Sequence, residues 1–197
     1  VSRTGGLPDT VRIYHHAAGQ LGRWVVRDEP LCIEEGQPRW REHPTGLRVD
    51  VAALPLGVLD GVELRSLDLG LADHDVVVFP SMAVSVVGFP RGLSAGAKLP
   101  IWKTGHLASE PDVDVDDLPC MYIDATTRGG MSGSPVLVRY LGPYPSRSGA
   151  VCFGNVTGFL GVYSSRLVVR DEEQGAPETV ELGRVWKPRV ISEILAG

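Results

Sequence analysis

Glycine and proline interrupt this chain so often that long helices have little room to form. The 197 residues include 24 glycines and 15 prolines. Between these turn residues lie short runs rich in β-branched and aromatic side chains, a pattern typical of strands joined by turns. A helical period is found near the end, where residues 187–195 place Val190, Ile191, Ile194 and Leu195 on one face. The sequence therefore predicts an all-β fold with one C-terminal helix.

The expected strands divide unevenly along the chain. Before residue 70, they are expected at 11–16, 21–27, 47–56 and 62–67. After it, they are expected at 75–80, 83–89, 100–109, 120–125, 134–140, 150–153 and 156–165, with 166–170 continuing the last. Many short strands between turn residues are typical of antiparallel barrels or a sandwich.

Charge and cysteine content narrow the class of protein. A net charge of −5 does not favour a nucleic-acid surface, and no apolar run approaches the ~20 residues of a membrane span. Residues 1–10 have neither a basic start nor an apolar stretch, so no signal peptide and a cytoplasmic location are expected. The three cysteines are far apart in the sequence, which favours free thiols over a disulfide scaffold: Cys32, Cys120 and Cys152.

Residues 129–138, GGMSGSPVLV, carry the clearest chemical signal. Ser132 stands among glycines, shortly before a run that favours a strand. Small neighbours allow a sharp turn that exposes the serine hydroxyl and lets backbone N–H groups converge where an oxyanion can sit. A glycine- and serine-rich turn without function explains the same residues, so the motif needs support from the rest of the chain.

The order of further motifs gives that support. DVAAL (50–54) precedes the GMSGSP motif (130–135), and GVYSSR (161–166) and GRVWKPRVISEIL (183–195) follow it. In these motifs the chain resembles the trypsin-like serine proteases of the chymotrypsin fold, particularly the bacterial trypsin-like peptidase domains. The resemblance covers most of residues 47–195, and the serine motif is its most specific part.

The resemblance implies a chymotrypsin-like double antiparallel β-barrel, a serine endopeptidase that cleaves protein or peptide substrates without a cofactor or metal ion. Residues 1–72 would form an incomplete first barrel, and residues 73–197 a second barrel with the C-terminal helix. Ser132 would be the nucleophile, and Asp50 would orient a histidine base. The amides of Gly130 and Ser132 would form the oxyanion hole.

The histidine base has no clear position in the sequence. His15 and His16 lie closer to Asp50 than the family's histidine lies to its aspartate, His43 lies closer still, and His74 and His106 follow it. Two alternatives remain. The base and the missing strands precede Val1, or the base is His15 or His16, which also fit a strand end packed against Trp24.

Substrate preference is expected to depend on residues on both sides of the serine loop. In this fold the residue six positions before the nucleophile lines the base of the S1 pocket, and here it is Thr126. A preference for Lys or Arg is therefore not expected. Ser164 is expected to pair its backbone with the substrate and to meet Asp50 through its hydroxyl. Arg166 either reaches the pocket mouth and favours an acidic or polar P1 residue, or is an exposed arginine at a strand end.

Regulation by a freed N-terminal amine is not expected, because Met131 occupies the position where that amine would need a carboxylate partner. We therefore expect control by another domain, a loop or a partner protein. A rival function from a different class is a protease-like module that binds peptides without cutting them. The acidic stretches 109–119 and 170–178 are expected to be solvated loops, because the first lacks the glycine and terminal Glu of a calcium loop.

Overall fold

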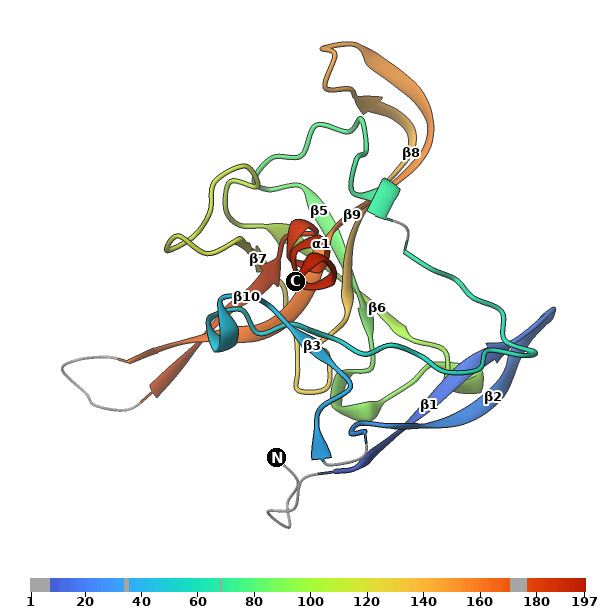
Figure 1. The fold of residues 1–197 in the computed structure, drawn as a ribbon. Coiled ribbons are helices and arrows are strands. Elements are labelled where there is room, and N and C mark those ends of the chain that lie inside the picture. The colour runs from blue at the N-terminus through green and yellow to red at the C-terminus, as the bar shows by residue number, and fades with distance from the viewer. Residues whose placement is uncertain (1–7, 34–35, 68, 171–176) are drawn as a thin grey trace.

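A computed structural model describes residues 8–33, 36–67, 69–170 and 177–197. In the second part of the chain, six antiparallel strands close into a barrel (Figure 1). These strands are β5 Ala83–Gly88, β6 Ile101–Leu107, β7 Cys120–Asp124, β8 Pro135–Pro145, β9 Val151–Arg170 and β10 Pro177–Trp186. Their order around the barrel is β10-β7-β6-β5-β8-β9, and β9 pairs with β10 to close it.

Alternation of side chains along the strands builds the barrel core. In β5, Val84 and Val86 are fully buried, whereas Ser85 between them is only half-buried. This period of two places every second residue inside the barrel. The buried cluster holds Val76, Met82, Val84, Val86, Leu107, Met121, Ile123, Ala125, Met131, Val136, Val138, Leu160, Tyr163 and Val185.

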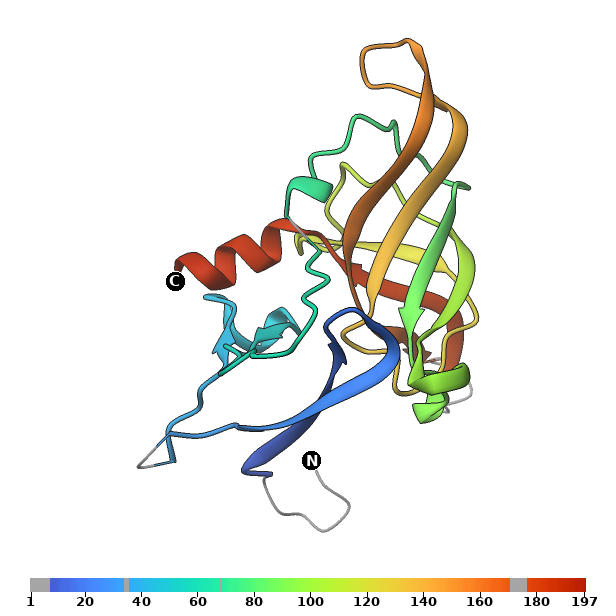
Figure 2. The same ribbon diagram turned by 90° about the vertical axis from the view of Figure 1, so that its right-hand side faces the viewer.

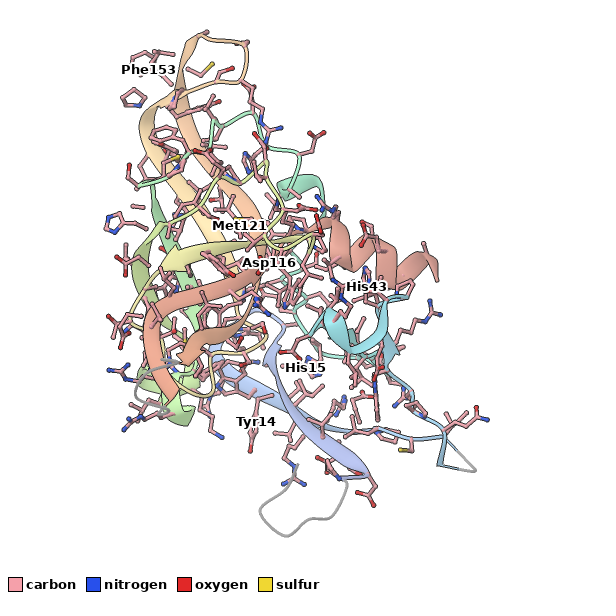
Figure 3. All side chains as sticks on the ribbon, turned by 90° about the vertical axis from the view of Figure 1, so that its left-hand side faces the viewer. Tyr14, His15, His43, Asp116, Met121 and Phe153 are labelled. Carbon is pink, nitrogen blue, oxygen red and sulfur yellow. The ribbon has the colours of Figure 1, made fainter. Side chains whose placement is uncertain are left out.

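The β8–β9 hairpin extends well beyond the barrel, as the projecting loop in Figure 2 shows. Its register runs from Pro135 opposite Val162 out to Pro145 opposite Val151. The continuation of 156–165 into 166–170 is thus confirmed, and the run 150–153, expected as a separate strand, belongs to the same strand, β9. Phe153 lies at the far end of this hairpin and is 82% exposed (Figure 3).

The C-terminal helix α1, Arg189–Ala196, connects the barrel to the first part of the chain. Val190 and Ile194 pack against Val49, and the same buried cluster includes Cys120 and Trp186 at facing ends of β7 and β10. Figure 2 shows α1 beside the short strands β3 and β4. The expected apolar face is therefore confirmed at Val190 and Ile194, while Leu195 is exposed.

The first part of the chain contains two separate two-stranded sheets. Strands β1 Thr10–Ala17 and β2 Gln20–Pro30 form a hairpin, and β3 Arg41–Glu42 pairs with β4 Ala52–Ala53. The described residues include the 3₁₀ helices η2 Gly46–Arg48, η3 Leu69–Leu71, η4 Pro90–Gly92 and η5 Gly96–Lys98. Only two residues of the run 47–56 join a strand, and the run 62–67 contributes a single bridge, from Val62 to Ala17.

The sequence prediction is thus confirmed in its coarser form. The chain is mostly β, with a six-stranded antiparallel sheet and one C-terminal helix. The residues described before position 73 form two separate two-stranded sheets and do not close into a barrel. The three cysteines are free, and Cys120 is the buried one. Within the described ranges, no helix is long and apolar enough to cross a membrane.

Candidate active site

The loop between β7 and β8 is held in place on both sides of Ser132. The Met131 side chain is fully buried in the barrel core. The N–H of Gly133 donates to the carbonyl oxygen of Tyr163 at 2.8 Å, and the N–H of Ser134 donates to that of Met131 at 3.0 Å. The serine between these anchors is exposed. Met131 is buried and Gly133 is hydrogen-bonded to β9, so the Ser132 hydroxyl between them lies at the surface.

Glycine is required at position 130 by the close approach of a neighbouring segment. Gly130 has φ +89°, in the left-handed region, and a Cβ there would lie 2.7 Å from the carbonyl oxygen of Phe89. The same segment donates a hydrogen bond from the N–H of Arg91 to the oxygen of Gly129 at 2.6 Å. Residues 89–92 thus pack closely against the serine loop, and only a residue without a side chain fits at position 130.

The backbone N–H groups of Gly130 and Ser132 have no acceptor in the part of the chain that the structure describes. Their neighbours differ: the N–H of Met131 donates to the oxygen of Arg128 at 3.2 Å. Two amide donors without an acceptor, separated by one residue and next to an exposed hydroxyl, can bind an anionic oxygen. The residues expected to form the oxyanion hole thus carry the donors that such a site needs.

Ser164 contacts both Ser132 and Asp50. The Ser132 hydroxyl donates to the carbonyl oxygen of Ser164 at 2.5 Å. The Ser164 hydroxyl donates to Oδ2 of Asp50 at 2.8 Å, across 114 positions of sequence. Ser164 is only 4% exposed, so this donor would be costly without an acceptor. The structure therefore brings together the three residues that the sequence placed in three separate motifs.

A buried valine fixes the position of Asp50. Val49 is 4% exposed and packs with Trp186 and with Val190 and Ile194 of α1. Its N–H donates to the carbonyl oxygen of Gly46 at 3.1 Å, at the end of η2. Asp50 itself is exposed and follows directly. Val49 was missed as a site residue in the sequence, because it looked like one of several apolar residues in the run 47–56.

A second set of contacts joins α1 to the segment that leads to Asp50. His43 is buried, and its Nε2 lies 2.6 Å from a carboxylate oxygen of Glu193 in α1. Its Nδ1 lies 2.8 Å from the Thr45 hydroxyl. The guanidinium of Arg41 donates to the carbonyl oxygen of Leu195 at 3.3 Å. The C-terminal helix therefore holds the Asp50 segment against the barrel, and His43 has a structural partner.

None of the five histidines makes a hydrogen bond or ion pair with Ser132 or Asp50 in this structure. His15 lies on β1 (Figure 3), and His16 stacks on Trp24 with ring centroids 4.3 Å apart, which confirms the expected packing. His106 is exposed on β6. His74 is buried, and burial lowers the pKa of its imidazole. The site as described holds a hydroxyl, a carboxylate and two free amides, and no base.

A pocket of about 270 Å³ opens beside Ser132. Its lining residues come from the serine loop and from β9: Arg128, Gly129, Ser132, Tyr163, Ser164, Ser165, Arg166 and Val168. Thr126 is exposed and does not line this pocket, so its role in substrate binding stays a prediction. Its neighbour Thr127 is fully buried and bonded to the Tyr163 hydroxyl at 2.5 Å.

The acidic stretch 109–119 has a structural role that the sequence did not reveal. Asp114 lies 2.7 Å from the ammonium of Lys187, which is 6% exposed, and it also pairs with Arg189. The hydrogen bond from Lys187 lowers the pKa of Asp114. Among the described residues, no group of three His, Cys, Asp or Glu could hold a metal ion. Residues 171–176 of the second acidic stretch lie outside the described residues.

Comparisons with known protein families, with curated proteins and with solved structures give no match.

Proposed function

We propose that this chain is the peptidase part of a serine endopeptidase with a chymotrypsin-like double barrel. The single observation that carries the proposal is the position of Ser164, which bonds to Ser132 through its carbonyl and to Asp50 through its hydroxyl. A nucleophilic serine and the carboxylate that orients its base must lie within reach of the same histidine. Ser164 contacts both Ser132 and Asp50, and this shared contact supports the proposal.

In the proposed reaction, the Ser132 oxygen attacks the carbonyl carbon of a peptide bond. The hydroxyl proton, which in this structure points to the carbonyl of Ser164, passes to a histidine that later returns it to the leaving amine. The negative charge that develops on the carbonyl oxygen is stabilised by the N–H groups of Gly130 and Ser132. One such donor is worth about 3–4 kcal/mol of transition-state stabilisation.

The histidine base is proposed to come from a part of the protein outside residues 1–197. Two observations support this. All five histidines of the chain are described, and none is bonded to Ser132 or Asp50. The β1–β2 hairpin pairs with no further strand among the described residues, although isolated two-stranded hairpins are marginally stable. Additional strands beside this hairpin would complete a first barrel and bring the base.

Met131 argues against activation by a freed N-terminal amine, because its side chain has no charge to pair with one. This side chain is fully buried and anchors the serine loop by apolar packing. Control by another domain, a loop or a partner protein is therefore part of the proposal, with proteins or peptides as the substrate.

A second candidate function is a peptide-binding module that has the protease fold and does not cut. None of the five histidines is bonded to Ser132 or Asp50, and this favours the binding module, because a site without a base would bind peptides and leave them intact. The full-length protein separates the two candidates, since the enzyme needs a histidine near Ser132 and the module does not.

Labelling with a fluorophosphonate tests the proposal. The serine oxygen displaces fluoride from the probe, so labelling requires an activated hydroxyl. We expect the full-length protein to label at Ser132, the Ser132→Ala variant not to label, and a matched Ser192→Ala variant, at an exposed position of α1 outside the pocket, to label normally. Absence of labelling in the full-length protein would favour the binding module, and labelling that persists in Ser132→Ala would place the nucleophile elsewhere.

The isolated segment 1–197 tests the location of the base. Loss of a triad member costs several orders of magnitude in rate, so this segment should be nearly inactive. Strong peptidase activity of the segment, lost in His15→Ala or His16→Ala, would make one of these residues the base.

A further inference from the structure

The pocket beside Ser132 has the size and position of a side-chain subsite. Its volume of about 270 Å³ lies below the range of about 300–1,000 Å³ typical of drug-sized ligands, so it suits one amino-acid side chain. Ser132 and Ser164 form part of its wall. A side chain that enters it would therefore belong to the residue whose carbonyl carbon lies next to the Ser132 oxygen, which is the P1 residue of a substrate.

Two arginines give this pocket a positive charge. Arg128 and Arg166 line it, and none of the lining residues that the structure describes is an Asp or Glu. Arg166 has no hydrogen bond or ion pair to any of the described residues. Arg128 lies 3.9 Å from Glu181, whose side chain is 55% exposed, and its Nη1 donates to the carbonyl oxygen of Thr127 at 3.1 Å. Guanidinium groups bind carboxylates through paired N–H donors, and Nε and Nη2 of Arg128 and the guanidinium of Arg166 have no partner among the described residues.

We propose that this pocket selects an acidic P1 side chain, whose carboxylate binds between Arg128 and Arg166. The assignment of the pocket to P1 rests on the proposed peptidase function. The charge preference does not, because it follows from the lining residues alone. The two guanidiniums also repel a Lys or Arg side chain, which excludes a trypsin-like preference by electrostatics.

Peptide binding to the Ser132→Ala variant of the full-length protein tests the charge preference without any chemistry. Three fluorescent peptides of one sequence, with Glu, Gln or Lys at the P1 position, are compared by anisotropy at low ionic strength. Glu and Gln have similar shape and differ in charge. We expect the Glu peptide to bind about tenfold more tightly than the Gln peptide, the Lys peptide to bind most weakly, and the preference to fall with added salt.

Variants in the same background assign the preference to its residues. Arg166→Gln and Arg128→Gln should each reduce the Glu-over-Gln ratio by about threefold or more, and Arg166→Lys should retain part of it, since an ammonium lacks the paired donors. Arg139→Gln, which changes a β8 arginine outside the pocket, should leave the ratio unchanged. Equal binding of Glu and Gln peptides, a ratio that survives both pocket variants, or no binding of any peptide would overturn the proposal.

The two proposals fail in different experiments. If fluorophosphonate does not label Ser132 but the Glu peptide binds preferentially, the peptidase function is wrong and the positively charged pocket belongs to a binding module. If Ser132 labels but the Glu and Gln peptides bind equally, the peptidase function stands and the acidic preference is wrong.

Discussion

The Ser164 hydroxyl donates a hydrogen bond of 2.8 Å to Oδ2 of Asp50, although 114 positions separate the two residues. Ser164 is buried in β9, and Asp50 is exposed at the end of a short loop. The bond therefore joins the barrel to the part of the chain that precedes it. It also places a carboxylate close to the residue that accepts the Ser132 hydrogen bond.

A double-mutant cycle measures this bond directly. Asp50→Ala removes the acceptor from a buried hydroxyl and should lower the free energy of unfolding by about 1–3 kcal/mol. Ser164→Ala should cost about 1 kcal/mol, and the double variant should show a coupling energy of about 0.5–1.5 kcal/mol in urea unfolding. Ser165→Ala, next to Ser164 and exposed, should show no coupling to Asp50. A coupling energy of zero for the Asp50–Ser164 pair would contradict the structure.

Neighbouring glycines in the serine loop should respond differently to alanine. Gly130→Ala forces a Cβ to within 2.7 Å of the Phe89 oxygen at a φ of +89°, and should lower the free energy of unfolding by about 1–3 kcal/mol. Gly129→Ala meets no atom within 4 Å and should change it by less than about 0.5 kcal/mol. Thermal unfolding of the two variants checks this, and similar losses in both would mean that the loop has a different conformation.

The burial of His74 should make stability depend on pH. Its pKa is lowered below the ordinary 6.5, mainly by burial, so the unfolded chain takes up this proton at a higher pH than the folded chain. The contribution of neutral His74 to the free energy of unfolding is fully present above pH 6.5, and it is lost as the pH falls from there through the folded-state pKa. Unfolding between pH 7 and 5 should show a smaller loss in His74→Gln than in the unchanged protein. An NMR titration that places the His74 pKa at or above 6.5 would refute this prediction.

Asp114, which pairs with Lys187, should contribute more to the free energy of unfolding than the other carboxylates of its loop. Asp114→Ala leaves the buried ammonium of Lys187 with the carbonyl oxygen of Val113 alone, and should cost about 1–3 kcal/mol. Because the pKa of Asp114 is lowered, its contribution is present above pH 3.8 and is lost as the pH falls through the folded-state pKa. Asp112→Ala, an exposed neighbour, is the control in urea unfolding. Equal effects of the two substitutions would show that the Lys187 pair is not formed.

Local patterns predicted most of the barrel and missed segments whose structure depends on a partner. The run 83–89 alternates buried and less buried residues, and its strand β5 Ala83–Gly88 was predicted within one residue. The first half of β10, PETVEL, is polar and acidic and gave no strand signal, yet it is extended by pairing with β9. The apolar run 47–56 looked like a strand, but only Ala52 and Ala53 find a partner, in β3. Backbone hydrogen bonds between distant segments decide such cases, and short sequence windows do not contain them.

At the site, the residue types could be read from the sequence. Gly130 can adopt a positive φ and lie close to Phe89, and the apolar Met131 side chain is buried, so Ser132, between Met131 and Gly133, is exposed. The surroundings of Ser132 depend instead on how distant segments pack. Burial of Val49 against α1 brings Asp50 to Ser164, and the closing of β9 beside the serine loop puts Arg166 next to Arg128. These neighbours are set by packing and hydrogen bonds between segments far apart in the chain, which no local pattern encodes.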